Sequence, residues 1–150
     1  MSEQIDAENN SIHFSWYGGM HKKLRIIATS VLTTAPYNPF NFLLSPTSYN
    51  HMPFSYDLDL KKLLYPYLET ISIGKSLRVY GDDLVATTKG NTLSFLSELT
   101  IKIHQDFSLE IREVGEPYLP DETFDLKRAS CRDLAWMQIQ LLRHYGMAAR

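Results

Sequence analysis

The chain has 150 residues, of which 44% are apolar, 12% aromatic and 21% charged. This composition is that of one folded globular domain and excludes a chain that is disordered along its whole length. Fifteen basic residues against 17 acidic ones give a formal net charge of -2. No overall positive charge therefore favours nucleic acid or anionic lipid, and we expect neither a nucleic-acid nor a membrane partner.

The N-terminal part is predicted to be rich in strands. Residues 1–10 form a polar tail that lacks the basic start and the apolar stretch of a signal peptide, so we expect a cytoplasmic protein. Ile12, Phe14 and Trp16 then alternate with polar residues, which is the period of a strand with one buried face. A Gly-Gly turn and a run of β-branched residues follow. We therefore predict a hairpin over residues 11–33.

The segment from Ala35 to Tyr56 is rich in proline, asparagine and aromatic residues. Its prolines and asparagines interrupt the apolar residues throughout, which excludes a membrane span. An ordered irregular segment that packs on a core is predicted instead. The β-rich N-terminal region is accordingly placed at residues 11–56.

Two helices are predicted in the middle of the chain. Asp57 is a good N-cap for a short helix with three leucines on one side. Residues 70–90 give no clear pattern. Asn91 or Thr92 then opens a helix that is expected to end near Asp106.

A short strand and a loop are predicted next. The apolar residues of 107–111 alternate with polar ones, as in a strand with one buried face. Gly115, Pro117 and Pro120 then indicate a loop.

The last segment contains the clearest helix. Ser130 is a good N-cap, Asp133 completes a capping-box pattern, and Gly146 is a typical residue after a helix end. Cys131 therefore lies in the first turn. Two apolar stripes cover more of this helix than a surface helix would show, so we expect it to be buried. The stripes consist of Leu134, Met137 and Leu141, and of Ala135, Ile139 and Leu142.

Cys131 is the single cysteine of the chain, so no intrachain disulfide forms. At a helix N-terminus, unpaired backbone N–H groups and the charge of the neighbouring Arg132 favour a thiolate. The same N–H groups can stabilise an oxyanion that forms when the sulfur attacks a carbonyl. The alternative is that Cys131 is a small apolar residue at the start of a core helix, and helix position alone favours this alternative.

Separate stretches of the chain resemble the transglutaminase-like superfamily. The run ASCRDLAW at residues 129–136 resembles the segment that opens the nucleophile helix of that family, and LLRHYGMAAR at 141–150 resembles its ending. The run NPFNFLL at 38–44, with two shorter runs after it, resembles the region ahead of the catalytic core in a bacterial branch of the family. Ala129 stands where the family usually has glycine. The resemblance covers most of residues 38–150.

The resemblance implies an α+β fold with a papain-like core that is incomplete at its C-terminus and is preceded by the small β-rich region. Residues 57–150 would be the first, helical half of the catalytic domain. The implied activity is attack by Cys131 on a peptide or protein amide, followed by hydrolysis with water or acyl transfer to an amine. In the family, the histidine and aspartate of the triad follow the nucleophile helix. The chain is therefore expected to be a fragment that is catalytically inert by itself.

The resemblance and the helix position also select the residues around the nucleophile. His144 lies about 20 Å from Cys131 along the same helix, which is too far for a base. The other histidines stand in no base motif. No metal is expected, because the acidic pair Asp82 and Asp83 has no third ligand at suitable spacing. No cofactor is expected either. The residues expected to support the nucleophile are Ser130, Arg132, Asp133 and Trp136.

Two other functions remain open. A non-catalytic or truncated relative would act as a binding module. In the family, strands pack on the nucleophile helix, so one of its apolar stripes is expected to be partly uncovered here and to favour self-association. A thiol redox sensor is the weaker alternative, because Cys131 has no resolving cysteine in the chain.

Overall fold

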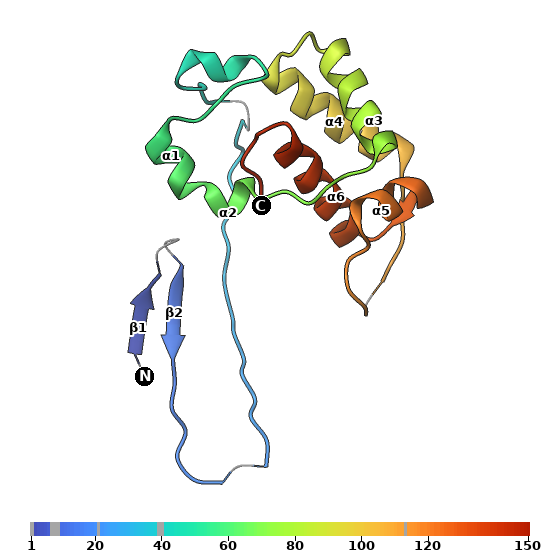
Figure 1. The fold of residues 1–150 in the computed structure, drawn as a ribbon. Coiled ribbons are helices and arrows are strands. Elements are labelled where there is room, and N and C mark those ends of the chain that lie inside the picture. The colour runs from blue at the N-terminus through green and yellow to red at the C-terminus, as the bar shows by residue number, and fades with distance from the viewer. Residues whose placement is uncertain (1, 7–9, 21, 39–40, 113) are drawn as a thin grey trace. The chain divides into compact units, whose positions relative to one another are not determined.

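The computed structural model describes residues 2–6, 10–20, 22–38, 41–112 and 114–150. It contains both helices and strands, which agrees with the predicted α+β class. The chain divides into two compact units, Met1–Pro39 and Phe40–Arg150, which are described separately (Figure 1).

The first unit contains one hairpin, formed by β1 (Ser2–Ile5) and β2 (Ser11–Phe14) in antiparallel pairing. The predicted hairpin over residues 11–33 is therefore wrong, and the described residues of 22–33 belong to neither helix nor strand. Turn chemistry explains the difference. Asp6 N donates to Asn10 O at 3.0 Å, and the Asp6 carboxylate accepts from Asn10 N at 2.8 Å, which closes the chain on the N-terminal side of β2.

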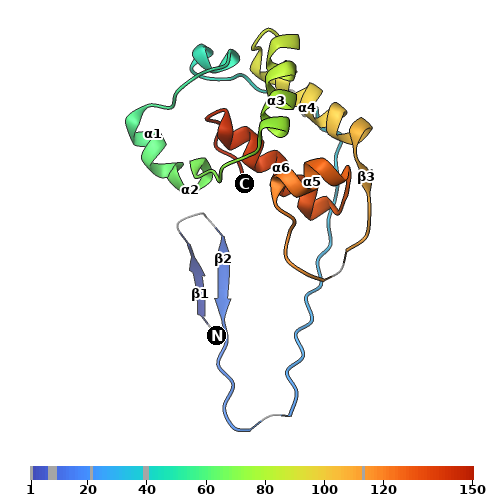
Figure 2. The ribbon, with the colours of Figure 1, turned by 45° about the vertical axis from the view of Figure 1, so that its right-hand side comes forward.

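The second unit is mainly helical. Helix α6 contacts α3 and α5, and α3 also contacts α4 (Figures 1 and 2). The elements of the second unit are the 3-10 helix η1 (Thr47–Asn50), α1 (Leu58–Leu63), α2 (Tyr65–Leu68), α3 (Lys75–Thr87), α4 (Thr92–Asp106), β3 (Ser108–Leu109), α5 (Pro120–Leu126), β4 (Arg128–Ala129) and α6 (Cys131–His144).

The two middle helices begin where their caps predict. The Asp57 carboxylate accepts from the backbone N–H of Asp59 and of Leu60, at 3.1 and 2.9 Å, and α1 starts at the next residue. The Asn91 side chain accepts from Ser94 N at 2.9 Å at the start of α4, which ends at Asp106 as predicted. Helices α3 and α5 are among those that were not predicted. Helix α3 lies within the stretch without a clear pattern, and Pro120 begins α5 rather than lying in a loop.

The segment before α1 belongs to the second unit. Thr92 Oγ1 donates to Tyr49 O at 2.6 Å, and Met52 N donates to Gly90 O at 2.7 Å. These bonds tie residues 49–52 to the start of α4. The division by contacts therefore falls earlier than the predicted boundary after residue 56.

The core of the second unit lies between α3, α4 and α6. Its fully buried apolar side chains are Leu77, Phe95, Leu99, Met137 and Leu141. Gly81 of α3 allows the close approach of α6, because a Cβ atom there would lie 2.5 Å from the hydroxyl oxygen of Tyr145. Of the two predicted stripes on α6, the one with Met137 and Leu141 is thus packed in this core.

The predicted strand over residues 107–111 is shorter in the structure. Only Ser108–Leu109 forms β3, which pairs in parallel with β4. Phe107 is buried as predicted, but Leu109 and Ile111 are 70% and 91% exposed, so the prediction of one buried face is wrong. The cause is that β3 has a single neighbouring strand in the described residues and nothing packs on that face. Since β4 leads directly into α6, its pairing with β3 fixes where α6 begins.

None of the helices in the described ranges is long and apolar enough to cross a membrane.

Candidate functional site

Cys131 is the first residue of α6, and it is exposed. The same helix has fully buried residues further along, among them Asp133, Met137 and Leu141. The alternative in which Cys131 is a packed core residue therefore does not hold. The thiol stands at the surface, on a helix that is anchored in the core.

The capping box at the start of α6 is confirmed. Ser130 Oγ accepts from Asp133 N at 3.4 Å, and the Asp133 carboxylate accepts from Ser130 N at 3.0 Å and from Ser130 Oγ at 2.7 Å. Gly146 follows the helix with a φ of 76°, as predicted for a residue after a helix end. Within the described part of the chain, the backbone N–H groups of Cys131 and Arg132 have no acceptor. They remain available as donors next to the thiol.

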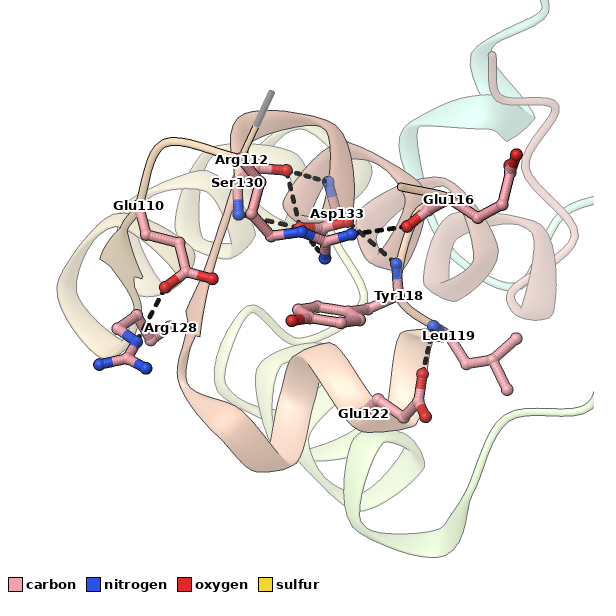
Figure 3. Close-up of polar contacts among 9 residues, drawn as sticks. All are labelled: Glu110, Arg112, Glu116, Tyr118, Leu119, Glu122, Arg128, Ser130 and Asp133. Carbon is pink, nitrogen blue, oxygen red and sulfur yellow. Dashed lines mark hydrogen bonds and ion pairs between the residues drawn. The ribbon is translucent and has the colours of Figure 1, made fainter. Parts of the chain in front are cut away.

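Asp133 also ties a distant segment to this turn (Figure 3). Its fully buried carboxylate accepts from Tyr118 N at 2.9 Å and pairs with Arg112 Nη1 at 3.1 Å. The Arg112 guanidinium donates from Nη2 to Glu116 O at 2.7 Å and lies 3.7 Å from the centre of the Tyr118 ring. Arg112 and residues 116–118 are thereby held against the start of α6. We call Arg112, Tyr118, Ser130 and Asp133 the Asp133 cluster.

The Asp133 cluster favours an ionised carboxylate. Burial by itself raises the pKa of Asp133, but hydrogen bonds from the Ser130 hydroxyl and from the backbone N–H groups of Tyr118 and Ser130 lower it, as does the charge of Arg112. The combined effect holds the pKa below the ordinary value of 3.8. The folded state therefore binds the Asp133 proton more weakly than the unfolded chain does.

We expect this shift to make stability depend on pH. Because the folded-state pKa is the lower one, ionised Asp133 contributes stability above the unfolded value of 3.8, and this contribution is lost as pH falls through the folded pKa. Urea unfolding of the natural chain and of Asp133→Asn should therefore differ most at neutral pH, and the difference should shrink below about pH 4. A difference that stays constant across this range would contradict the prediction. Asp59→Asn, at an exposed position, is the control.

The other predicted site residues lie outside the cluster. Arg132 is exposed, and Trp136 is half-buried one turn further along α6. Arg112 and Tyr118, which complete the Asp133 cluster, were not predicted. No sequence signal links them to α6, because the nearer of the two is 15 residues before Asp133.

The histidines offer no base on α6 itself. His144 is the last residue of α6, thirteen residues after Cys131, which corresponds to about 20 Å along the helix. His51 and His104 are exposed on other elements, His13 belongs to the first unit, and His21 lies outside the described residues. In the part of the chain that the structure describes, no three His, Cys, Asp or Glu side chains are grouped as metal ligands.

An apolar groove of about 580 Å³ runs along the second stripe of α6. Its lining includes Ala135, one helical turn after Cys131, and aromatic side chains, with the rings of Tyr49 and Phe54 5.0 Å apart. Residues of the chain segment after α6 also line the groove. Lining residues include Tyr49, Phe54, Tyr56, Ala135, Ile139 and Leu142.

Comparison with known proteins gives no relative for this chain. No protein-family model, no curated protein and no solved structure matches it.

Proposed function

We propose that the chain carries the nucleophile of a transglutaminase-like cysteine enzyme with a papain-like core, and that Cys131 is this nucleophile. The observation that carries the proposal is an exposed thiol on the first residue of a helix that is otherwise anchored in the core. The capping box supports it, because it fixes the backbone on both sides of Cys131. The free N–H groups of Cys131 and Arg132 supply donors for an oxyanion.

The proposed reaction uses a peptide or protein amide. The Cys131 thiolate attacks the carbonyl carbon, and the carbonyl oxygen becomes an oxyanion close to the free N–H groups. The C–N bond then breaks, the nitrogen takes a proton and leaves as an amine, and the acyl group stays on sulfur as a thioester. Water releases it as an acid, whereas an amine acceptor yields a new amide. No cofactor takes part, and a reducing compartment such as the cytoplasm keeps Cys131 as a thiol.

The base and its orienting acid are proposed to be a histidine and an aspartate outside the residues described. The 150-residue chain by itself is accordingly proposed to be inert toward amides, because proton transfer to the leaving nitrogen needs the base. A protein that joins this chain to both residues should hydrolyse peptide amides. In that protein Cys131→Ser should reduce turnover by roughly a thousandfold or more. Turnover of an amide by residues 1–150 alone would overturn the proposal of an inert fragment.

The nucleophile itself can be tested in the chain as it stands, with an activated ester instead of an amide. p-Nitrophenyl acetate releases a good leaving group and needs no general acid, so Cys131 should form an acetyl thioester and release p-nitrophenolate. We expect acetylation of Cys131 to be at least roughly tenfold faster than that of an ordinary exposed thiol, because the free N–H groups stabilise the oxyanion. Intact-mass measurement and p-nitrophenolate absorbance follow the reaction.

A matched control places the thiol in the middle of another helix. Thr100 is exposed within α4, where the backbone N–H groups are bonded inside the helix. The variant Cys131→Ser with Thr100→Cys therefore has its single thiol without free N–H groups beside it. Equal acetylation rates for Cys131 and for Thr100→Cys would show that Cys131 is an ordinary surface thiol.

A second candidate function, a binding module, is favoured by the apolar groove. Ile139, Leu142 and Phe54 line it, and their surface is available to a second copy of the chain. The proposed outcome is self-association that Ile139→Glu abolishes, measured by sedimentation velocity over a range of concentrations. A stable monomer at all concentrations would rule this candidate out.

A further inference from the structure

Residues 26–34 have the composition of a β-strand, but no strand in the described part of the chain pairs with them. Six of the nine residues are β-branched, and the segment contains no charged residue, proline or glycine. It belongs to neither helix nor strand, and Figure 1 shows it as part of an open run of chain after β2. We call residues 26–34 the unpaired segment.

The backbone and the apolar side chains of the unpaired segment are both open to solvent. Its backbone N–H and C=O groups form no hydrogen bond with any residue that the structure describes. Its large apolar side chains, Ile26, Ile27, Val31 and Leu32, are between 72% and 93% exposed. A neighbouring strand would satisfy this backbone and cover part of these side chains. An exposed segment of this composition is the kind that pairs with another chain.

The residues that flank the unpaired segment select an antiparallel arrangement of two copies. Lys22, Lys23 and Arg25 precede it, so a parallel ribbon in register would place these cations beside the same three of the other copy. An antiparallel ribbon places them at opposite ends. The two Arg25 residues are then about 33 Å apart, which is well beyond the Debye length of about 8 Å. Pro36 lacks the N–H that a strand pair needs, so it ends the pairing on the other side.

We propose that the unpaired segment is an interaction surface for a second copy of this chain, with which it forms an antiparallel two-stranded ribbon centred on Ser30. This register places uncharged residues opposite each other at every position of the segment. Ile27 of one copy faces Thr33 of the other, and Thr29 faces Val31, so that β-branched side chains pack across the ribbon. The inference goes beyond the proposed function, because it involves neither the thiol nor the apolar groove.

A two-stranded ribbon is only marginally stable in water, so the test reports a contact between particular residues rather than a stable dimer. The variant Cys131→Ser with Ser30→Cys has its single thiol at the centre of the proposed ribbon. Residues directly opposite in an antiparallel pair have Cα atoms about 4.5–5.5 Å apart, which suits a disulfide. Oxidised glutathione takes up the two electrons, and non-reducing electrophoresis follows the disulfide-linked dimer with time.

The matched control is Cys131→Ser with Ala35→Cys. Ala35 is exposed as Ser30 is, but in the proposed register the two copies of residue 35 are about 33 Å apart. The thiol at position 30 should therefore form the dimer faster by roughly tenfold or more, because pairing raises its effective concentration. Alkylation rates with iodoacetamide correct for any difference in reactivity between the two thiols.

A second pair of variants tests the β-pairing itself. Val31→Lys, added to the variant with the thiol at position 30, places a cation from each copy next to the centre of the ribbon. It should slow the dimer by roughly fivefold or more, through charge repulsion and lost β-propensity. Val31→Thr keeps a β-branched, uncharged side chain, so its rate should stay within about twofold of the parent rate. Because Val31 is exposed, neither change removes a buried contact.

The outcomes separate the proposed ribbon from other kinds of contact. Equal rates for the thiols at positions 30 and 35 would indicate random collision or a parallel ribbon, and would overturn the inference. A rate that Val31→Lys leaves unchanged would overturn it as well, because the contact would then not depend on pairing of this segment. Since Cys131 is replaced throughout, none of these results bears on the proposed nucleophile.

Discussion

Replacing Asp133 with alanine is expected to lower the free energy of unfolding by about 3–5 kcal/mol at neutral pH. The carboxylate is fully buried. It accepts hydrogen bonds from Ser130 and Tyr118 and forms an ion pair with Arg112. Alanine leaves these donors without an acceptor and leaves the Arg112 charge unpaired in a largely buried place. Urea unfolding followed by far-UV circular dichroism measures the loss.

An exposed ion pair provides the control. Asp59 and Lys62 are 3.0 Å apart, and their side chains are 91% and 75% exposed, so Asp59→Ala should change the free energy of unfolding by less than about 1 kcal/mol. Removing both Asp133 and Arg112 should cost less than the sum of the single losses, since no unpaired charge remains. Losses of similar size for Asp133→Ala and Asp59→Ala would show that the Asp133 cluster does not stabilise the fold.

Helix starts could be predicted because capping signals are local. The side chains of Asp57, Asn91 and Ser130 each accept from a backbone N–H two or three residues further on, so a window of a few residues contains the whole interaction. The same holds for the central part of the site. Cys131 and its capping residues Ser130 and Asp133 lie within four consecutive positions.

The remaining parts depend on contacts between distant residues. Helix α3 begins after Gly74, whose N–H donates to the carboxylate of Asp121, 47 residues away in the sequence, at 2.7 Å. No side-chain cap forms at Gly74 itself, so no local signal predicts where α3 begins. The pairing of Arg112 with Asp133 likewise joins residues that are distant in the sequence, so no local pattern predicts it. In the first unit, the alternation of Ile12 and Phe14 correctly indicated a strand but not its partner, which the Asp6 and Asn10 contacts determine. The periodicity of apolar residues predicts a single helix or strand. Which strands pair, and which distant residues form a site, depends on the folded structure.

Phe95→Ala is expected to lower the free energy of unfolding by about 3–5 kcal/mol, through the lost burial of the ring and the cavity that it leaves. Phe95 of α4 is fully buried, and its ring centre is 5.6 Å from that of Tyr145, just after the end of α6. Thermal and urea unfolding measure the loss. Leu58→Ala, at a position that is 78% exposed on α1, should change stability by no more than about 0.5 kcal/mol.

The two large losses should have different consequences for the thiol. Phe95 packs at the end of α6 opposite to Cys131, so the folded fraction of Phe95→Ala should be alkylated by iodoacetamide at the natural rate. Asp133→Ala should change that rate, because it removes the backbone anchor in the first turn of α6. Unchanged rates in both variants would mean that the core alone positions the start of α6. A change in Asp133→Ala alone would assign that role to the Asp133 cluster.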